Sequence, residues 1–256
     1  MQNSLPSKTL FLKEIRTLLE KHGDPERSKQ EKRYLYSDLE HYGITAPKGK
    51  KLFAPYKKQL KGLTKKEALE LARLFWKQPS HDERNFALNI INIHKEKLDS
   101  TDLSWIEDWM RECKGWALLD NFIIPVMPKI IKKDRGSAEA VLKKWIKDDD
   151  FWVRRSALLA QLLLFRTGKG GNKKLFFDLA ESQFDESWID EKYPKGEPRK
   201  RARFFIRKAI GWTLREMSKR DPESVVAFLK KNKTKMSGLS FRESSRKLPE
   251  KWKRKL

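Results

Sequence analysis

The sequence predicts an all-α protein whose helices stack in pairs into a solenoid with a concave basic face. Apolar residues recur at helical spacing through most of the 256 residues, and alternating strand patterns are almost absent. Capping signals separate these apolar runs, and a weak internal repeat links them. A chain of this length can also bury a sizeable core.

Capping residues mark several of the expected helix boundaries. An amphipathic helix over residues 7–22 ends at Gly23, and "DPER" at 24–27 supplies an N-cap followed by proline. "TKKE" at 64–67 is a capping box, and the Asp-Pro pair at 221–222 starts a further helix. We therefore expect roughly a dozen helices of about 10–20 residues, joined by short polar turns.

A weak repeat points to stacked helix pairs. "FWVRRSA" at 151–157 and "FFIRKAI" at 204–210 agree in residue type at each position, and "RNFAL" at 84–88 echoes "RRSAL" at 154–158 less closely. Helical units that recur along a chain bury a continuous core by stacking and curve into a solenoid. An irregular helical bundle is the alternative, because amphipathic helices resemble one another in any fold.

Two basic segments depart from the compact helical pattern. Residues 186–203 contain two prolines and six bases, four of them within 199–203, and we expect an exposed inserted loop there. Residues 246–256 carry six bases and one acid. We therefore expect a single domain over residues 1–240, followed by a basic C-terminal tail over 241–256.

The charge of the chain indicates an anionic partner. Lysine and arginine number 58 against 35 aspartates and glutamates, which gives a net charge of +23. So basic a protein repels itself unless an anion neutralises it, and nucleic acid is the commonest such partner. A membrane surface is the rival partner, but no run of residues approaches the roughly 18 apolar residues of a membrane span.

The rest of the composition excludes several classes of site. The single cysteine, Cys113, excludes an internal disulfide and a zinc site made of several thiolates. The four histidines show no metal-ligand spacing, and neither a phosphate-binding glycine loop nor a nucleophile elbow occurs. We therefore expect no metal and no cofactor. The N-terminus lacks a signal-peptide apolar core, so we expect an intracellular, cytoplasmic protein.

Nine tryptophans are interleaved with the many bases. Aromatic rings stack on nucleobases or sugars while cations neutralise phosphates, so this combination favours nucleic-acid binding. In "GWALLDNF", Trp116 and Asp120 are one helical turn apart and share a helix face. The alternative is a core tryptophan beside a surface aspartate, and spacing alone does not distinguish the two.

Three further places carry candidate residues of this kind. Arg154 and Arg155 lie near the start of a helix, where Arg155 could instead pair with the acids at 148–150. Trp212 follows a glycine that permits close approach to its helix, and Tyr34 lies in "EKRYLYSDLEHYGI".

Four of these motifs, in this order along the chain, carry a resemblance to a known family. They are "YLYSDLEHYGITAP", "WALLD", "DDDFWVRRSALLAQLL" and "FFIRKAIGWTLREMSKRDPESV", the last being the most specific. Over about residues 8–235 the chain resembles the DNA alkylation repair family of HEAT-like helical proteins, the AlkD-like DNA glycosylases.

The resemblance implies a HEAT-like solenoid that holds duplex DNA on its basic face and releases cationic N3- or N7-alkylated purines by hydrolysis. By matching positions, it implies that Asp120 is the catalytic carboxylate and that Trp116 and Trp212 are aromatic walls against the lesion sugar. Tyr34 would contact the DNA there, and Arg155 would hold a backbone phosphate.

We expect further DNA contacts from Arg154, Arg207 and Lys208, and a monomer, because a solenoid needs no partner to close its core. An alkylated purine is already cationic and leaves without a proton donor, so one carboxylate that stabilises positive charge on the sugar and orients water is sufficient.

A non-catalytic protein of the same family, which recognises branched or distorted DNA, is the alternative function. It is favoured by Ala117, which stands where catalytic relatives commonly carry a second aspartate, and by the basic segment 186–203. A helical scaffold for acidic proteins is a third reading, but it leaves Tyr34, Trp116 and Trp212 without a common explanation.

Overall fold

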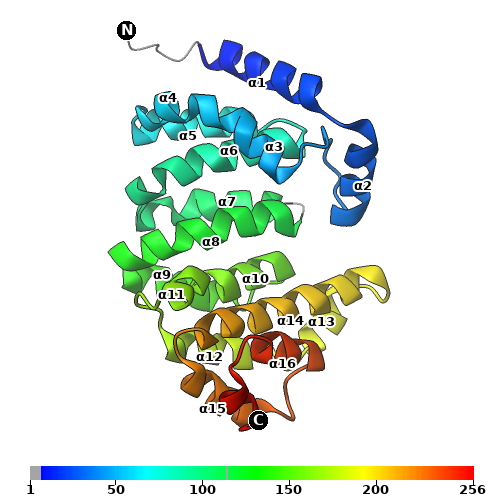
Figure 1. Ribbon diagram of the computed structural model, residues 1–256, viewed down its shortest axis with the longest axis vertical. Helices are drawn as coiled ribbons and strands as arrows, with labels where there is room; N and C mark the ends of the chain where they lie inside the picture. The colour runs from blue at the N-terminus through cyan, green and yellow to red at the C-terminus, as the bar shows by residue number, and fades with distance from the viewer. Residues whose placement is uncertain (1–6, 114) are drawn as a thin grey trace. The chain divides into compact units, whose positions relative to one another are not determined.

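The computed structural model describes residues 7–113 and 115–256, whose regular secondary structure is helical (Figure 1). Within these residues no β-strand occurs, and a single isolated bridge pairs Glu40 with Ser80. No helix in this described part is long and apolar enough to cross a membrane. The predicted all-α class is confirmed.

Backbone contacts group the chain into two compact units. Unit 1 comprises the described residues of 1–98 and 112–122, and unit 2 comprises 99–111 and 123–256. The division falls within the helix α8 (Trp116–Lys133), whose first two turns belong to unit 1. The single domain over residues 1–240 stays a prediction.

Unit 1 is built from six complete α-helices, two short 3-10 helices and the start of α8. They are α1 (Lys8–His22), α2 (Pro25–Leu35), α3 (Ala46–Phe53), η1 (Ala54–Tyr56), α4 (Lys57–Lys61), α5 (Lys65–Trp76), α6 (His81–His94) and η2 (Lys95–Lys97).

Unit 2 contains the remainder of α8 and the helices that follow it, together with a short 3-10 helix and α7. They are η3 (Ser100–Asp102), α7 (Leu103–Glu112, its last residue in unit 1), α9 (Arg135–Trp145), α10 (Phe151–Leu159), α11 (Leu162–Thr167), α12 (Lys173–Glu181), α13 (Ser187–Lys192), α14 (Glu197–Ser218), α15 (Pro222–Asn232), α16 (Gly238–Ser245) and α17 (Glu250–Lys253).

The predicted helix caps are confirmed. Asp24 accepts a hydrogen bond from the N–H of Arg27, Asp221 accepts one from Ser224, and Thr64 forms a complete capping box with Glu67. The predicted helix length is wrong in places, since α10 to α13 have only six to nine residues each. Short helices of this kind take their stability from tertiary packing rather than from their own hydrogen bonds.

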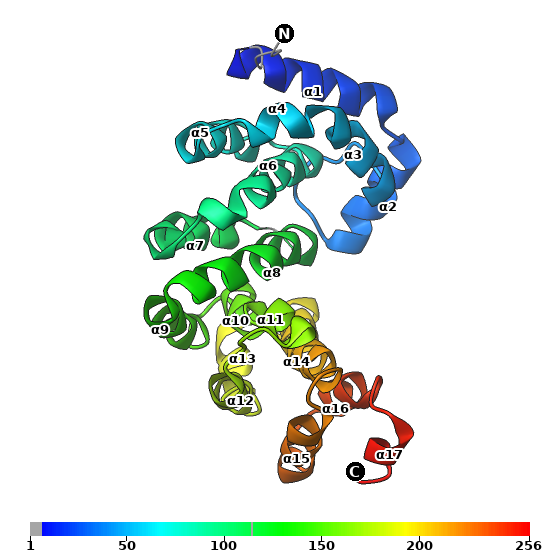
Figure 2. The ribbon, with the colours of Figure 1, turned by 60° about the vertical axis from the view of Figure 1, so that its left-hand side comes forward.

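The core of unit 1 is an aromatic cluster where α1, α5 and α6 meet (Figures 1 and 2). The ring of Phe11 lies 5.9 Å from that of Phe75 and 6.0 Å from that of Phe86, edge to face in both cases. Phe75 and Phe86 are themselves 4.8 Å apart. These three residues are at most 6% exposed, so the cluster holds α6 against its neighbours and positions the residues that α6 carries.

Unit 2 is organised around the long helix α14, which packs against α10, α11, α15 and α16 (Figure 2). The two halves of the predicted repeat meet here, because "FWVRRSA" lies in α10 and "FFIRKAI" in α14. The ring of Phe205 packs 4.7 Å from that of Trp152 and 6.2 Å from that of Phe151. Helix pairs joined by short turns thus recur within the unit, whereas the concave basic face stays a prediction.

The segment 186–203 is not a loop, contrary to the prediction. It forms α13, a short turn and the start of α14. Part of its positive charge is balanced by its own acids, since Arg203 pairs with both Glu186 and Asp190. Two apolar side chains, Ile189 and Ala202, are fully buried and anchor the segment.

The C-terminal residues 241–256 are not an extended tail either. They contain most of α16 and all of α17, and Leu248 is only 3% exposed. The close approach of α16 to α14 depends on Gly211. A Cβ at this position would lie 2.5 Å from the Cβ of Glu243 and 2.9 Å from the carbonyl oxygen of Ser240. Gly211, the glycine before Trp212, therefore allows α16 to pack closely against α14.

We predict that Gly211→Ala destabilises the protein by about 1–2 kcal/mol, because the steric overlap outweighs the roughly 1 kcal/mol gain in helix propensity. The matched control is Gly136→Ala in α9, where the nearest atom to a new Cβ is 3.8 Å away. Urea denaturation should show the control to be at least as stable as the wild type. Equal stability of Gly211→Ala and the wild type would show that α16 does not pack this closely.

Candidate functional site

The most exposed aromatic surface in unit 1 lies where α2 ends and α8 begins. Tyr34, in the last turn of α2, is 69% exposed, and its ring meets that of Trp116 edge to face at 6.1 Å and 90°. The next residues turn the chain out of the helix, since Tyr36 adopts a left-handed conformation with φ 50°. Large aromatic rings facing solvent are uncommon in isolated domains and mark surfaces that contact ligands.

Asp120 lies one turn further along α8 than Trp116. Both side chains are partly exposed, whereas Leu118 and Leu119 between them are at most 2% exposed. The helix therefore directs its apolar side into the core of unit 1, and the face with the tryptophan and the carboxylate stays partly exposed. The structure thus brings together three of the predicted site residues, Tyr34, Trp116 and Asp120.

The predicted residues Arg154 and Arg155 belong to unit 2 and are buried. The guanidinium of Arg154 lies 3.5 Å from the ring centroid of Trp188, and its Nη1 donates to Gln183 at 3.2 Å. Burial lowers the pKa of Arg154. Nη1 of Arg155 donates to the carbonyl oxygen of Phe205 at 2.8 Å. Both side chains hold α10 against its neighbours. Their role in phosphate binding stays a prediction, and their burial argues against it.

The remaining predicted residues lie on α14. Arg207 forms a two-pronged ion pair with Glu186, whose hydrogen bonds raise the pKa of the arginine. Lys208 donates to Glu243 at 2.7 Å. Both cations are about one third exposed, and Trp212 is partly exposed one turn further on.

One cluster of titratable groups escaped the sequence analysis. The isolated bridge at Glu40 aligns two distant loops, and His41 and His81 stack with ring centroids 4.7 Å apart and an interplanar angle of 13°. Both ring nitrogens of His41 and Nε2 of His81 are buried without a hydrogen-bond partner in the described residues. No local spacing could have revealed this pair, because the residues are 40 positions apart and meet only through tertiary pairing.

These two histidines and Asp82 offer possible ligand atoms within 4.8 Å of one another. A metal ion lies in the plane of each imidazole that binds it, so two stacked, nearly parallel rings do not converge on one ion. Asp82 is also engaged, since its Oδ2 accepts the N–H of Tyr42 at 2.8 Å. We therefore assign the cluster to packing and not to metal binding.

Comparisons with known proteins find one matching family and two similar structures. The chain matches the family described as "DNA alkylation repair enzyme" over residues 15–248. Its structure is similar to that of a "Predicted DNA alkylation repair enzyme from Enterococcus faecalis", with a TM-score of 0.67, 21% identity, and coverage of 89% of this chain and 97% of that chain. It is also similar to smu.31 from Streptococcus mutans UA159, with a TM-score of 0.51, 17% identity, and coverage of 80% and 97%. Identities this low show a shared fold alone. Among proteins with curated descriptions, none matches.

We expect the histidine pair to make the folded protein less stable in acid. Burial, the neighbouring His41 and Arg84 lower the pKa of His81 from 6.5 to about 3. Between pH 6.5 and about 3, His81 therefore binds a proton in the unfolded chain but not in the folded protein. Stability falls as pH falls through this window. Asp82 acts in the opposite sense, because burial raises its pKa from 3.8 to about 6.

We expect His81→Gln to remove the part of the acid-induced fall in the free energy of unfolding that His81 causes. The difference in free energy between pH 7 and pH 4 should shrink by roughly 3 kcal/mol relative to the wild type, measured by urea titrations. The Asp82 contribution largely cancels in this comparison. A profile of His81→Gln that matched that of the wild type would contradict the assignment.

Proposed function

The chain belongs to the DNA alkylation repair enzyme family, and on that premise we propose that it is a DNA glycosylase. It acts on duplex DNA and releases cationic N3- or N7-alkylated purines by hydrolysis of the N-glycosidic bond. The observation that carries the proposal is the grouping in unit 1 of Tyr34, Trp116 and Asp120, in which an exposed tyrosine meets a partly exposed tryptophan one helical turn from a carboxylate.

The chemistry of the leaving group explains why one carboxylate is enough. An N3- or N7-alkylated purine carries a positive charge, so it departs as a neutral base without a proton from an acid. Positive charge then grows on the deoxyribose. The carboxylate of Asp120 stabilises this charge and orients the attacking water, and the water oxygen bonds to the anomeric carbon as the carbon–nitrogen bond breaks.

The aromatic pair supplies the second part of the site. The face of Trp116 attracts a cationic sugar by about 0.5–2 kcal/mol, depending on how completely water is excluded. Tyr34 supports the tryptophan edge to face and offers its own exposed ring to the DNA. On unit 2, the family pattern assigns Trp212 an aromatic contact and Arg155 a contact with a backbone phosphate. We further propose that Arg154, Arg207 and Lys208 contact the DNA.

The net charge of +23 supplies the affinity for duplex DNA. Cations that contact phosphates release the counterions condensed on DNA, which favours binding at low salt and makes it fall steeply as salt rises. This contribution is independent of sequence, so it holds the protein on undamaged DNA and leaves selection of the lesion to the site on α8.

We predict that Asp120→Asn lowers the rate of release of 7-methylguanine or 3-methyladenine from methylated duplex DNA by at least about 100-fold, because the amide keeps the shape but removes the charge. Single-turnover assays that quantify the free base measure this rate. Asp178→Asn is the matched control, since Asp178 is an exposed acid on α12 that pairs with Lys174. Its activity should equal that of the wild type.

Two outcomes contradict the catalytic assignment. If the wild type releases neither base, the protein is not a glycosylase for these lesions, and tighter binding to branched than to linear duplex DNA would then support the non-catalytic alternative. If Asp120→Asn is as active as the wild type, another group performs the chemistry.

We predict that Tyr34→Ala lowers excision about 10-fold through the lost aromatic contact. Because Tyr34 is exposed, the free energy of unfolding should change by no more than about 0.5 kcal/mol. Leu10→Ala, which removes a 60% exposed apolar side chain from α1, should alter neither quantity. Parallel measurement of excision and urea stability separates a functional effect from a structural one. Unchanged excision by Tyr34→Ala would remove the tyrosine from the proposed site.

A further inference from the structure

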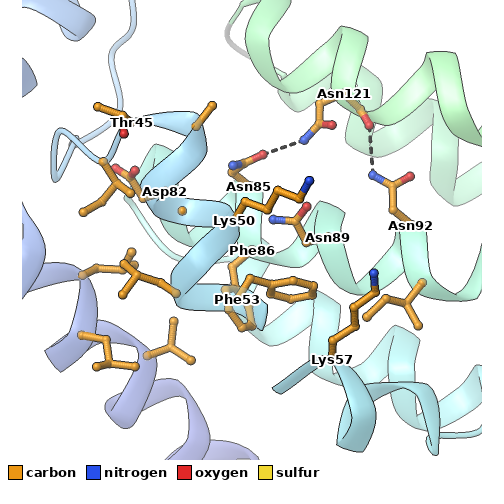
Figure 3. Close-up of a pocket in the computed structure, with 18 of the residues that line it drawn as sticks. Thr45, Lys50, Phe53, Lys57, Asp82, Asn85, Phe86, Asn89, Asn92 and Asn121 are labelled. Atoms are coloured by element: carbon orange, nitrogen blue, oxygen red, sulfur yellow. Dashed lines mark hydrogen bonds between the residues drawn. The ribbon is translucent and has the colours of Figure 1, made fainter. Parts of the chain in front are cut away.

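Unit 1 contains a pocket of about 620 Å³ that the proposed chemistry on α8 does not use (Figure 3). It lies among α1, α3, α4 and α6, and Asn121 of α8 reaches its edge. Pockets of roughly 300–1,000 Å³ hold ligands of drug or nucleotide size. The volume therefore accommodates a small organic molecule with several rings or substituents.

The walls of the pocket are strongly cationic. Four lysines line it, Lys50, Lys57, Lys61 and Lys95, and none of them forms an ion pair with any acid in the described part of the chain. The only acid in the lining is Asp82, whose pKa burial raises to about 6. Such a surplus of cations around a concave space favours an anionic ligand, because low-dielectric walls concentrate the field.

The wall formed by α6 carries three asparagines. Asn85, Asn89 and Asn92 project from one side of the helix, and Figure 3 shows Lys50 and Lys57 extending toward them. Asn121 donates to Asn85 at 2.7 Å, and Asn92 donates to the backbone of Asn121 at 3.2 Å.

Two of these amides are left with groups to satisfy. The Oδ1 of Asn92 is buried and has no hydrogen-bond partner among the described residues, and Asn89 makes no hydrogen bond there. The Oδ1 of Asn92 is closed off from the pocket, whereas Asn89 is partly exposed in the wall, so its amide can bond to a ligand. Amides that present donors and acceptors side by side match the edge of a nucleobase.

The floor of the pocket is apolar and aromatic. Phe53 and Phe86 meet edge to face at 4.9 Å, and Ile15 and Leu19 of α1 complete the surface. A flat ring system packs well on such a floor, whereas a sugar phosphate or an inorganic anion leaves it uncovered.

From these three features we propose that the pocket binds one unpaired nucleotide, with the base on Phe53, the edge of the base at Asn89, and the phosphate at Lys50 and Lys57. The nucleotide is either a free mononucleotide or a nucleotide turned out of DNA. The inference does not depend on the excision chemistry, because none of the pocket residues belongs to the proposed catalytic group.

Calorimetric titration of the full chain with adenosine 5′-monophosphate tests the proposal. We expect saturable binding of one equivalent, and much weaker binding of ribose 5-phosphate or inorganic phosphate, which lack the base. Asn89→Leu should weaken binding at least about 10-fold, and the double variant Lys50→Gln, Lys57→Gln should weaken it by a similar factor. The matched control is Lys58→Gln, an exposed neighbour in α4 that does not line the pocket.

A second titration distinguishes the two sources of the nucleotide. A duplex with 2-aminopurine opposite an abasic site gains fluorescence when the base leaves the stack. If the pocket takes a base from DNA, the protein should raise this fluorescence, and both Asn89→Leu and excess adenosine 5′-monophosphate should prevent the rise. If mononucleotide binds but the fluorescence does not change, the ligand is the free nucleotide.

Absence of saturable mononucleotide binding up to about 1 mM, together with no change in the duplex fluorescence, would overturn the proposal. Equal affinity for inorganic phosphate would overturn the role of the base. Asp120→Asn should retain full nucleotide binding. The nucleotide titration therefore tests the pocket even if the proposed glycosylase function is wrong.

Discussion

Acidic side chains are outnumbered by basic ones in this protein, 35 to 58, and the way in which they are shared among the bases organises the fold. Glu243 of α16 is only 7% exposed, yet it accepts hydrogen bonds from both Lys208 and Arg215 of α14. Burial alone would raise the pKa of Glu243, but the two cations outweigh it and hold the pKa below its usual range. Glu186 likewise takes both nitrogens of Arg207. Such carboxylates join helices that are distant in sequence, and removal of one would leave partly buried cations facing each other.

The same excess of bases over acids decides which basic side chains remain available to a ligand. Arg207 and Lys208 stand in a basic stretch of the sequence, yet each is already paired with a glutamate. The lysines around the pocket of unit 1, such as Lys50 and Lys57, have no acidic partner in the described part of the chain. A base that is already paired gains less from a phosphate than one that is not, because the existing pair must first be broken. Net charge therefore indicates an anionic partner, but only the distribution of acids indicates where that partner is bound most favourably.

The proposed catalytic group and the pocket of unit 1 both include residues of α8. Trp116 and Asp120 lie on its partly exposed face, and Asn121, the next residue, reaches the asparagine wall of the pocket. The tight core residues Leu118 and Leu119 fix the rotation of this helix. A rigid helix that carries a carboxylate on one side and a binding wall beside it is well suited to hold a reactive sugar in position, since catalysis by charge depends on groups that need no rearrangement.

The sequence by itself determined the all-α class, the helix starts at Asp24, Thr64 and Asp221, and the pairing of Trp116 with Asp120 on one face. These features depend on residues within a few positions of one another, and helical geometry relates such residues directly. Only the tertiary structure decided that the basic segment 186–203 is helical, that Gly211 admits α16, and that His41 stacks on His81. Each of these depends on groups far apart in the chain, whose charges and volumes meet only after the helices have packed.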